Sequence, residues 1–370
     1  MAELLKNKYP LEVAKTIGGM IVKVYPEFDS TGFIKHVAKG YEQLELMDRG
    51  RKISAALKVF LPENFKQAVT ILLASLDSPY EQDPENSLAS FIFMPHTMFV
   101  TENGLDDFDT SMAAHYQLTQ RFTSEFAIRA FIERYPEQSL GLLKQWAVDA
   151  NYHVRRLVSE ATRTRLPWAS RLPEFIKDPS PVVELLEQLK DDTELYVRRS
   201  VANNLNDIGK DHPQLLANLA TAWLVDAPKD RVWLVKHALR SAIKRGESGA
   251  LKALGYSKNL DVKVTSCDVS PQKCAMGSSV IINFTLHNQS QHSAALMVDF
   301  AVHFVKANGN SNPKVFKLKA IELAANQSMS FSKKVSLKPM TTRTLYAGLH
   351  KVEAIVNGDN AIIGSFELVE

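Results

Sequence analysis

The 370-residue sequence predicts an all-α repeat domain followed by an all-β sandwich. A chain of this length exceeds the usual size of one domain. In the first part, apolar residues recur at spacings of three and four, which is the period of amphipathic helices. In the last part, apolar and polar residues alternate, which is the period of strands. We place the boundary so that the domains cover residues 1–256 and 257–370.

Helical periodicity runs through most of the first domain. Prolines fall between the periodic segments, where helices begin or end, so the helices are about three turns long and joined by short connections. The clearest segments are residues 50–61, 64–76, 139–150, 181–191, 212–227 and 231–246.

Seven short segments of the second domain alternate apolar and polar residues. Turns rich in Gly, Asn, Ser and Pro separate them, which predicts an antiparallel β-sandwich of immunoglobulin-like shape. The chain has no Cys…Trp…Cys pattern, so no disulfide is expected to join the sheets. The segments are residues 260–269, 278–288, 295–306, 313–323, 328–337, 345–358 and 361–369.

The helical domain contains an internal repeat with an offset of 43 residues. The stretch "NYHVRRLVSEA", which begins at Asn151, aligns with "ELYVRRSVANN", which begins at Glu194, and Glu160 aligns with Asn203. A period of about 40 residues with a helix–turn–helix unit predicts HEAT-like repeats. In such solenoids equivalent positions of neighbouring repeats lie side by side on a concave face.

These repeats predict a basic lining of the concave face. Guanidinium groups match phosphate oxygens bidentately, so arginines in a row suit a nucleic-acid backbone. A structural contact between repeats is the alternative for Arg155 and Arg198. The candidate DNA-binding residues are Arg155, Arg156, Arg163, Arg165, Arg198, Arg199 and Asn203.

The net charge of +3 is unevenly distributed along the chain. Residues 1–139 carry 14 basic and 19 acidic side chains, whereas residues 140–256 carry 18 and 14, and residues 257–370 carry 12 and 8. A polyanion is therefore expected to approach the later part of the chain and to be repelled by the first part.

Several classes of protein are disfavoured by composition. Cys267 and Cys274 cannot form a disulfide framework, which suits a reducing cytoplasm. No run of 18 apolar residues and no signal-peptide core is present, so no membrane partner is expected. The histidines lack metal-ligand spacing, and there is no P-loop or GxGxxG motif, so we expect no metal and no cofactor.

Three carboxylates accompany the arginines: Glu125, Glu160 and Asp207. Carboxylates repel phosphate, so a simple DNA-binding surface would not place them there. They can stabilise a cationic damaged base, or the oxocarbenium-like sugar that forms when an N-glycosidic bond breaks. Trp168 offers a π-face to the same cation. A salt bridge to a neighbouring arginine is the alternative for Glu125 and Asp207.

Three motifs resemble those of the AlkC-type alkylpurine DNA glycosylases, which belong to the HEAT-like repeat superfamily together with the AlkD type. They are "SEFAIR" at residues 124–129, "HVRRLVSEATRTRLPWA" at 153–169 and "VRRSVANNLNDIGKDHP" at 197–213. The resemblance covers the repeat domain, and some AlkC-type proteins also carry an immunoglobulin-like C-terminal domain. Ala161 and Thr164 depart from the expected "SEGTRPRLPW", which bears on helix geometry.

The resemblance implies a glycosylase of base excision repair that releases 3-methyladenine, and 3-methylcytosine, from distorted double-stranded DNA without base flipping. It implies that Glu160 is the leading carboxylate and faces the deoxyribose, with Glu125 and Asp207 as supporting acids. Trp168 would contact the damaged nucleotide.

Arg156 and Arg163 would clamp the phosphate backbone. No lysine lies between Lys144 and Lys177 to form a Schiff base, so the enzyme is expected to be monofunctional and to leave an abasic site. It is expected to act in the bacterial cytoplasm, at the nucleoid when bound to DNA, and as a monomer, because gripping one duplex needs no second copy.

Two other functions remain open. HEAT-like solenoids often bind proteins, so the chain could be an interaction scaffold, or a DNA-binding relative without catalysis. The lysines of "KVFKLK" (residues 314–319) and "SKKVSLK" (residues 332–338) also have two interpretations. They could contact DNA, or they could protect strand edges from pairing with other chains.

Overall fold

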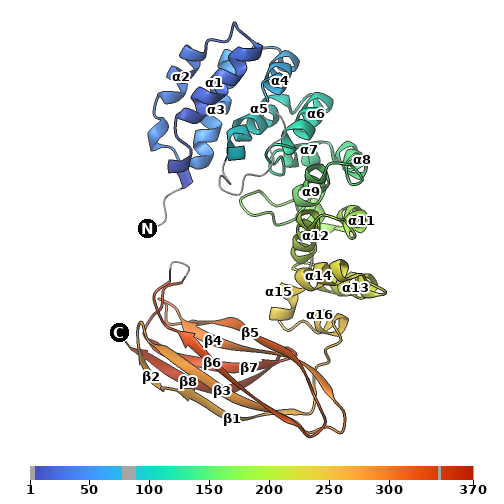
Figure 1. Cartoon of the computed structure of the whole chain (residues 1–370), viewed down its shortest axis with the longest axis vertical. Coiled ribbons are helices and arrows are strands. Elements are labelled where there is room, and N and C mark those ends of the chain that lie inside the picture. Colours follow the sequence, from blue (N-terminus) through green and yellow to red (C-terminus); the bar gives the residue numbers. More distant parts are fainter. Residues whose placement is uncertain (1–4, 77–88, 341–342, 370) are drawn as a thin grey trace. The chain divides into compact units, whose positions relative to one another are not determined.

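The computed structural model, which describes residues 5–76, 89–340 and 343–369, confirms the predicted fold class of helical repeats followed by a β-sandwich (Figure 1). Packing divides the chain into two compact units, Met1–Ile208 and Gly209–Glu370. The secondary structure changes from helix to strand much later, between Ala253 and Val262. The last helices therefore pack as part of the same unit as the sandwich.

The regular secondary structure of the first unit, in its described residues, is entirely helical. Short 3-10 turns occur at Leu5–Lys8, Tyr41–Gln43 and Ala89–Phe93. The α-helices are α1 (Glu12–Val24), α2 (Ser30–Ala38), α3 (Leu46–Phe60), α4 (Phe65–Ala74), α5 (Met94–Gly104), α6 (Phe108–Thr119), α7 (Arg129–Arg134), α8 (Pro136–Trp146), α9 (Tyr152–Ala161), α10 (Pro173–Lys177), α11 (Ser180–Leu189) and α12 (Leu195–Ile208).

The internal repeat of the sequence corresponds to two helix pairs, α8 with α9 and α11 with α12. Helix α9 packs against α12, and α8 packs against α11, as stacked repeats require. The turn between the two helices is built in the same way in both copies. The carboxylate of Asp149 accepts a hydrogen bond from the backbone N–H of Asn151 at 2.7 Å, and Asp192 accepts one from Glu194 at 2.9 Å. Because the turns match, the second helices start in the same register.

The second unit begins with the helices α13 (Pro213–Leu224), α14 (Lys229–Ala238), α15 (Arg240–Lys244) and α16 (Ser248–Ala253). The single helix expected over residues 231–246 is divided between α14 and α15. After α15 the backbone turns at Gly246, which lies against Gly358, and both have positive φ, at 69° and 81°. A Cβ built on Gly358 would lie 2.7 Å from the Cα of Gly246, so the approach requires glycine at both positions.

The sandwich has eight strands in the described residues, one more than the sequence predicted. The additional strand, β2, has three residues, too few for an alternating pattern to be recognised, and it pairs in parallel with β8. The sheet orders are β1-β3-β6 and β2-β8-β7-β4-β5. The strands are β1 (Val262–Ser270), β2 (Lys273–Ala275), β3 (Ser279–Asn288), β4 (Ala294–Val305), β5 (Ser311–Leu323), β6 (Ser328–Ser336), β7 (Gly348–Val356) and β8 (Asp359–Val369).

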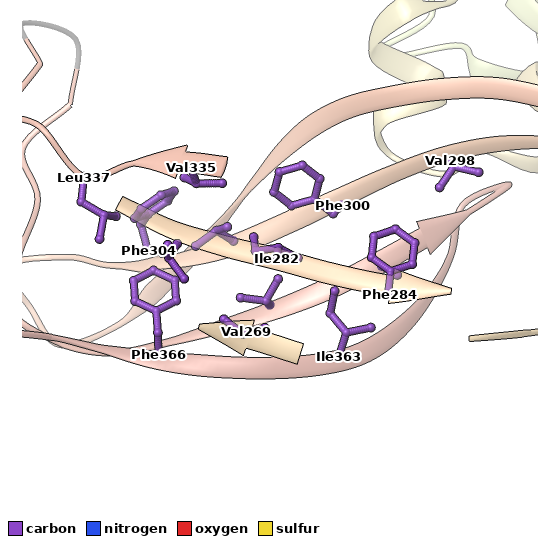
Figure 2. Packing of buried hydrophobic residues seen from close by; sticks show 14 of the residues in the cluster. Val269, Ile282, Phe284, Val298, Phe300, Phe304, Val335, Leu337, Ile363 and Phe366 are labelled. Carbon is purple, nitrogen blue, oxygen red and sulfur yellow. The ribbon is translucent and has the colours of Figure 1, made fainter. Parts of the chain in front are cut away.

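The core of the sandwich lies between the inner faces of these sheets. Alternate residues of β3 are buried, among them Ile282 and Phe284, and β4 contributes Val298 and Phe300 from the opposite sheet (Figure 2). Phe366 of β8 is also fully buried in this cluster. The alternation of buried and exposed residues is the pattern from which the sandwich was predicted.

The lysine-rich segments lie on the outer strands of both sheets. Strand β5 is at the edge of the larger sheet, and β6 is at the edge of the smaller one. Their lysines are exposed, at Lys314, Lys317, Lys319, Lys333 and Lys334. Edge strands with lysines resist pairing with other chains, so this placement is compatible with both interpretations of these segments.

Among the described residues, no helix has the length and apolar character that spanning a bilayer would require.

Two buried histidines predict that the protein loses stability in acid. Burial lowers the pKa of His96 to about 4 and that of His115 to about 3. In the unfolded chain a histidine titrates near 6.5, so stability should be constant above that pH and fall as pH decreases towards 4. Each histidine should cost up to about 1.4 kcal/mol per pH unit in that window.

The measurement is the free energy of unfolding in urea at several pH values between 7 and 4.5. His96→Leu removes one of the two groups and should reduce the loss of stability per pH unit. An unchanged pH dependence in this variant would contradict the assignment.

Candidate active site

Five charged side chains alternate in sign, in the order Glu125, Arg156, Glu160, Arg163 and Asp207, from the segment before α7 to the second repeat. We call this set the charge ladder. The guanidinium of Arg156 forms an ion pair with Glu125, and its Nη2 lies 3.8 Å from Oε1 of Glu160. Arg163 donates from Nη1 to Oε1 of Glu160 at 2.6 Å, and from Nε and Nη2 to Oδ2 of Asp207 at 2.8 Å each.

The helical register of α9 and α12 explains how the ladder forms. Arg156 and Glu160 are one turn apart on α9, Arg163 follows the end of α9, and Asp207 belongs to α12. Ser200, also on α12, donates a hydrogen bond to Oε2 of Glu160 at 2.6 Å. Glu160 is thus held from both repeats.

The three carboxylates of the ladder are buried, and they outnumber its guanidinium groups by one. Burial opposes the charge of Arg156, but Glu125, Tyr196 and Glu160 together raise its pKa above the ordinary arginine value. Burial likewise opposes the charge of Arg163, whose pKa Glu160 and Asp207 raise. Both arginines therefore stay protonated and paired with the buried carboxylates.

These contacts differ from the phosphate clamps expected for Arg156 and Arg163. Both side chains are nearly buried and direct their donors to carboxylates of the protein. Arg156 also lies over the ring of Tyr196, with Cζ 5.1 Å from the ring centroid. In the described structure these arginines organise the carboxylates.

Arg155 and Arg198 make the structural contacts that were the alternative to DNA binding. Arg155 forms a two-point ion pair with Asp192 of the next repeat, with Nε–Oδ2 and Nη2–Oδ1 distances of 2.6 and 3.0 Å. It also donates to the carbonyls of Asp149 and Ala150. The buried Arg198 donates to the carbonyls of Asp192 and Thr193. These donors hold the turns between helices and are not directed at solvent.

Arg199, in contrast, is exposed on α12 and forms no ion pair within the described part of the chain. Arg165 and Asn203 are partly exposed. The structure therefore separates the seven candidate DNA-binding residues into three groups. Two arginines make structural contacts, two belong to the charge ladder, and the other three, Arg165, Arg199 and Asn203, are at least partly exposed.

Trp168 lies in the loop between α9 and α10. Its side chain is 86% exposed, and its backbone is in the left-handed region, with φ 66°. Residues with a bulky side chain rarely adopt this conformation, because it is strained. An exposed aromatic ring on a strained backbone is a common feature of functional sites.

A pocket of about 840 Å³ in the first unit joins Trp168 to one end of the charge ladder. Glu125 and Arg156 line it together with Trp168 and Tyr196. Of the three ladder carboxylates Glu125 lines this space, and Glu102, which is not part of the ladder, lines it too. Glu160 occupies the centre of the ladder. The remaining wall combines apolar residues with polar and charged ones. The apolar residues include Leu46, Met47, Phe91, Met94, Met98, Phe122, Phe126 and Ala127, and the charged ones are Arg51, Glu102, Arg121 and Arg129.

The structure brings the three predicted carboxylates into one ladder and places Trp168 on the pocket that Glu125 lines. It adds three neighbours that the sequence did not indicate, Tyr196, Ser200 and Arg129. Ser200 directly follows the second Val-Arg-Arg motif, and Tyr196 directly precedes it, so the repeat alignment could have drawn attention to both. Arg129 ends the "SEFAIR" motif, but nothing in its local sequence indicates a long-range contact.

No cluster of three or more His, Cys, Asp or Glu side chains that could hold a metal ion occurs among the described residues.

Comparison with known proteins identifies both parts of the chain. The DNA alkylation repair enzyme family matches residues 111–245, and the C-terminal Ig-like domain of the uncharacterised protein YhaZ matches residues 263–370. The protein YhaZ of Bacillus subtilis, described as uncharacterised, is 35% identical over 356 residues, which are 96% of each chain.

A solved structure extends the similarity to the whole fold. The alkylpurine DNA glycosylase AlkC of Pseudomonas fluorescens, bound to DNA containing an abasic site analogue, is 37% identical and matches with a TM-score of 0.89. The match covers all of both chains. The chain belongs to the AlkC family of alkylpurine DNA glycosylases, as the motif resemblance indicated.

The two kinds of arginine should respond differently to truncation. Arg155→Ala leaves the nearly buried Asp192 without its partner, so we expect the free energy of unfolding to fall by about 3 kcal/mol. Arg199→Ala removes an exposed side chain and should change stability by less than about 0.5 kcal/mol. Urea unfolding of both variants checks this contrast.

The matched measurement is DNA affinity as a function of salt. Arg199→Ala should weaken binding to any duplex and reduce the slope of log Kobs against log salt concentration by about 1. Equal loss of stability in both variants would contradict the distinction.

Proposed function

We propose that the chain is a monofunctional DNA glycosylase of base excision repair that hydrolyses the N-glycosidic bond of cationic alkylated bases. The bases in question are 3-methyladenine and 3-methylcytosine, in distorted duplex DNA and without base flipping. The observation that carries this proposal is the charge ladder, in which arginines hold three buried carboxylates and one of these, Glu125, lines a pocket together with the exposed Trp168.

Buried carboxylates in fixed positions suit a reaction in which positive charge develops. When an N-glycosidic bond breaks, the sugar acquires oxocarbenium character, and fixed carboxylates in a site shielded from water stabilise it. A base that already carries positive charge leaves more easily, so the enzyme has less to supply. A surface that only gripped phosphate would gain nothing from buried acids, since they repel phosphate.

The positions of the carboxylates suggest a division of labour. Glu125 borders the pocket with Trp168, so we assign it the closest approach to the damaged nucleotide. Glu160 accepts hydrogen bonds from Arg163 and Ser200 on its two oxygens, which fixes its orientation at the centre of the ladder. Asp207 holds Arg163 in place. We propose that the three act as one unit in stabilising the developing charge.

Double-stranded DNA is the proposed partner. The region from residue 140 to residue 256 carries four more basic than acidic side chains, and Arg199 is exposed there. The family relationship supports this partner, because the Pseudomonas enzyme was solved on DNA. Distortion of the duplex could expose a weakened glycosidic bond without extruding the base.

The chemistry proposed is hydrolysis without strand cleavage. A glycosylase that nicks the strand forms a Schiff base through an amine, most often that of a lysine. No lysine is among the residues that line the described pocket. The proposed product is therefore free base and DNA with an intact backbone at an abasic site.

Neutralising the ladder carboxylates tests the proposal. Glu125→Gln and Glu160→Gln should each lower the single-turnover release of 3-methyladenine from methylated duplex DNA by at least about 100-fold, because each removes charge stabilisation from the transition state. DNA affinity should be retained, since the change removes a negative charge. Glu184→Gln is the matched control. Glu184 is an exposed carboxylate on α11 that pairs with Lys144 of α8, and this variant should release base at the normal rate.

The same assay separates the competing functions. Binding of damaged DNA by the unmodified protein without release of base would indicate a DNA-binding relative that lacks catalysis. Neither binding nor release would favour a protein-binding scaffold. Normal release by the triple variant with Glu125, Glu160 and Asp207 all neutralised would reject the charge-stabilisation mechanism while leaving the activity intact.

We also propose that the lysines of the edge strands contact DNA phosphates. Replacing Lys314, Lys317, Lys319, Lys333 and Lys334 by Gln should weaken DNA binding and lower its salt dependence, because fewer counterions are released. Lys35→Gln with Lys39→Gln, on and just after α2, is a charge control that should leave binding unchanged. Undiminished DNA binding with increased aggregation of the five-lysine variant would favour edge protection instead.

A further inference from the structure

The loop that carries Trp168 has few means of holding the ring in place by side-chain packing. The loop spans residues 162–172, between α9 and α10, and the ring is almost completely exposed. Its turn is closed by one backbone hydrogen bond, from Ala169 to the carbonyl of Leu166 at 3.2 Å. The left-handed backbone of Trp168 costs about 1–3 kcal/mol, which the surrounding structure must offset.

One side chain holds both ends of this loop. Arg129, the first residue of α7, donates from Nη1 to the carbonyls of Ala161 and Arg163, at 2.8 Å each. From Nη2 it donates to the carbonyl of Ser170. The guanidinium fork thus links the end of α9, the ladder residue Arg163 and the far side of Trp168.

Burying the charged guanidinium of Arg129 costs free energy, which suggests that this residue has a role beyond general stability. Its side chain is buried, with 2% of the residue exposed, and within the described residues it forms no ion pair with a carboxylate. Burial lowers its pKa to about 10, which leaves it protonated at neutral pH. The charge of Glu133 opposes this effect of burial on the pKa, whereas the hydrogen bonds of the guanidinium go to carbonyl groups. A buried charge held in this way is unfavourable relative to an apolar side chain.

We propose that Arg129 is a positioning residue, which fixes the Trp168 ring and the Arg163 end of the charge ladder relative to each other. Arg129 also lines the pocket, but its hydrogen bonds go to backbone carbonyls, so we assign it positioning and no contact with the reacting atoms. This inference rests on the proposed function, because it gives Arg129 a part in the excision reaction through Trp168. Misplacement of a contacting group by about 1 Å can lower a rate by about 100-fold. Loss of the hydrogen bonds from the Arg129 guanidinium should therefore lower the rate of the chemical step.

The test compares Arg129→Lys with Arg49→Lys. Lysine keeps the charge but cannot span three carbonyls as a planar fork. Arg49 is a matched control, because it too is buried and donates to backbone carbonyls, those of Lys6, Tyr9, Glu42 and Leu44, but it holds the start of α3. Both variants should lose stability, whereas Arg129→Lys alone should reduce single-turnover release, by about 10- to 100-fold, with DNA affinity little changed.

A double-mutant cycle shows whether Arg129 acts through Trp168. In a Trp168→Ala background, Arg129→Lys should reduce the rate much less than in the unmodified protein, because the group being positioned is already gone. Fully multiplicative losses would overturn the proposal. Adding guanidinium ion at millimolar concentration to Arg129→Ala should recover part of the lost rate, which a purely structural defect would not allow.

A measurement independent of activity separates this inference from the proposed function. The fluorescence anisotropy decay of Trp168, taken as the difference between the protein and its Trp168→Phe variant, should gain a fast component in Arg129→Lys and not in Arg49→Lys. If the unmodified protein released no methylated base, the proposed function would be wrong. The anisotropy decay would still show whether Arg129 holds the Trp168 loop. If Arg129→Lys folded and showed normal base release and normal anisotropy, the positioning role would be refuted. If Arg129→Lys did not fold, base release by Arg129→Ala with and without guanidinium would test the positioning role instead.

Discussion

Burial of several charged side chains next to one another is the constraint on which the rest of the site depends. A charge taken out of water is costly unless a partner lies close to it. In the charge ladder each arginine lies between two carboxylates, so burial of all five charges is tolerated. In the reaction that we propose, carboxylates fixed in this way need not reorganise when positive charge develops.

Stacking of helical repeats provides the precision that such a ladder needs. The ladder is shared between α9 and α12, and its spacing depends on how these two helices are set against each other. The ion pair of Arg155 with Asp192 and the matched turns at Asp149 and Asp192 fix that setting. The same Val-Arg-Arg motif thus serves two purposes, since the first arginine aligns the repeats and the second belongs to the ladder in one copy and is exposed in the other.

Much of the fold could be predicted, because periodicity is a local property of sequence. The helices, seven of the eight described strands and the repeat register all follow from spacings of apolar residues, whereas β2 is too short to show a pattern. In the site, the identities of the carboxylates and of Trp168 could be predicted, but their partners could not. Whether Arg156 faces phosphate or Glu125 depends on packing between segments about thirty residues apart. The hydrogen bonds of Arg129 go to backbone carbonyls, which every residue type has. The sequence therefore could not indicate its partners.

The contact between Gly246 and Gly358 has a consequence for how this unit can vary. Where a large side chain meets a small one, a mutation on one side can be rescued by shrinking the other. Here neither residue has a side chain to shrink, and both backbones are in the left-handed region. Second-site suppressors of a substitution at either glycine should therefore not arise at its partner. They would have to come from the loops that flank the pair, by moving whole backbone segments apart.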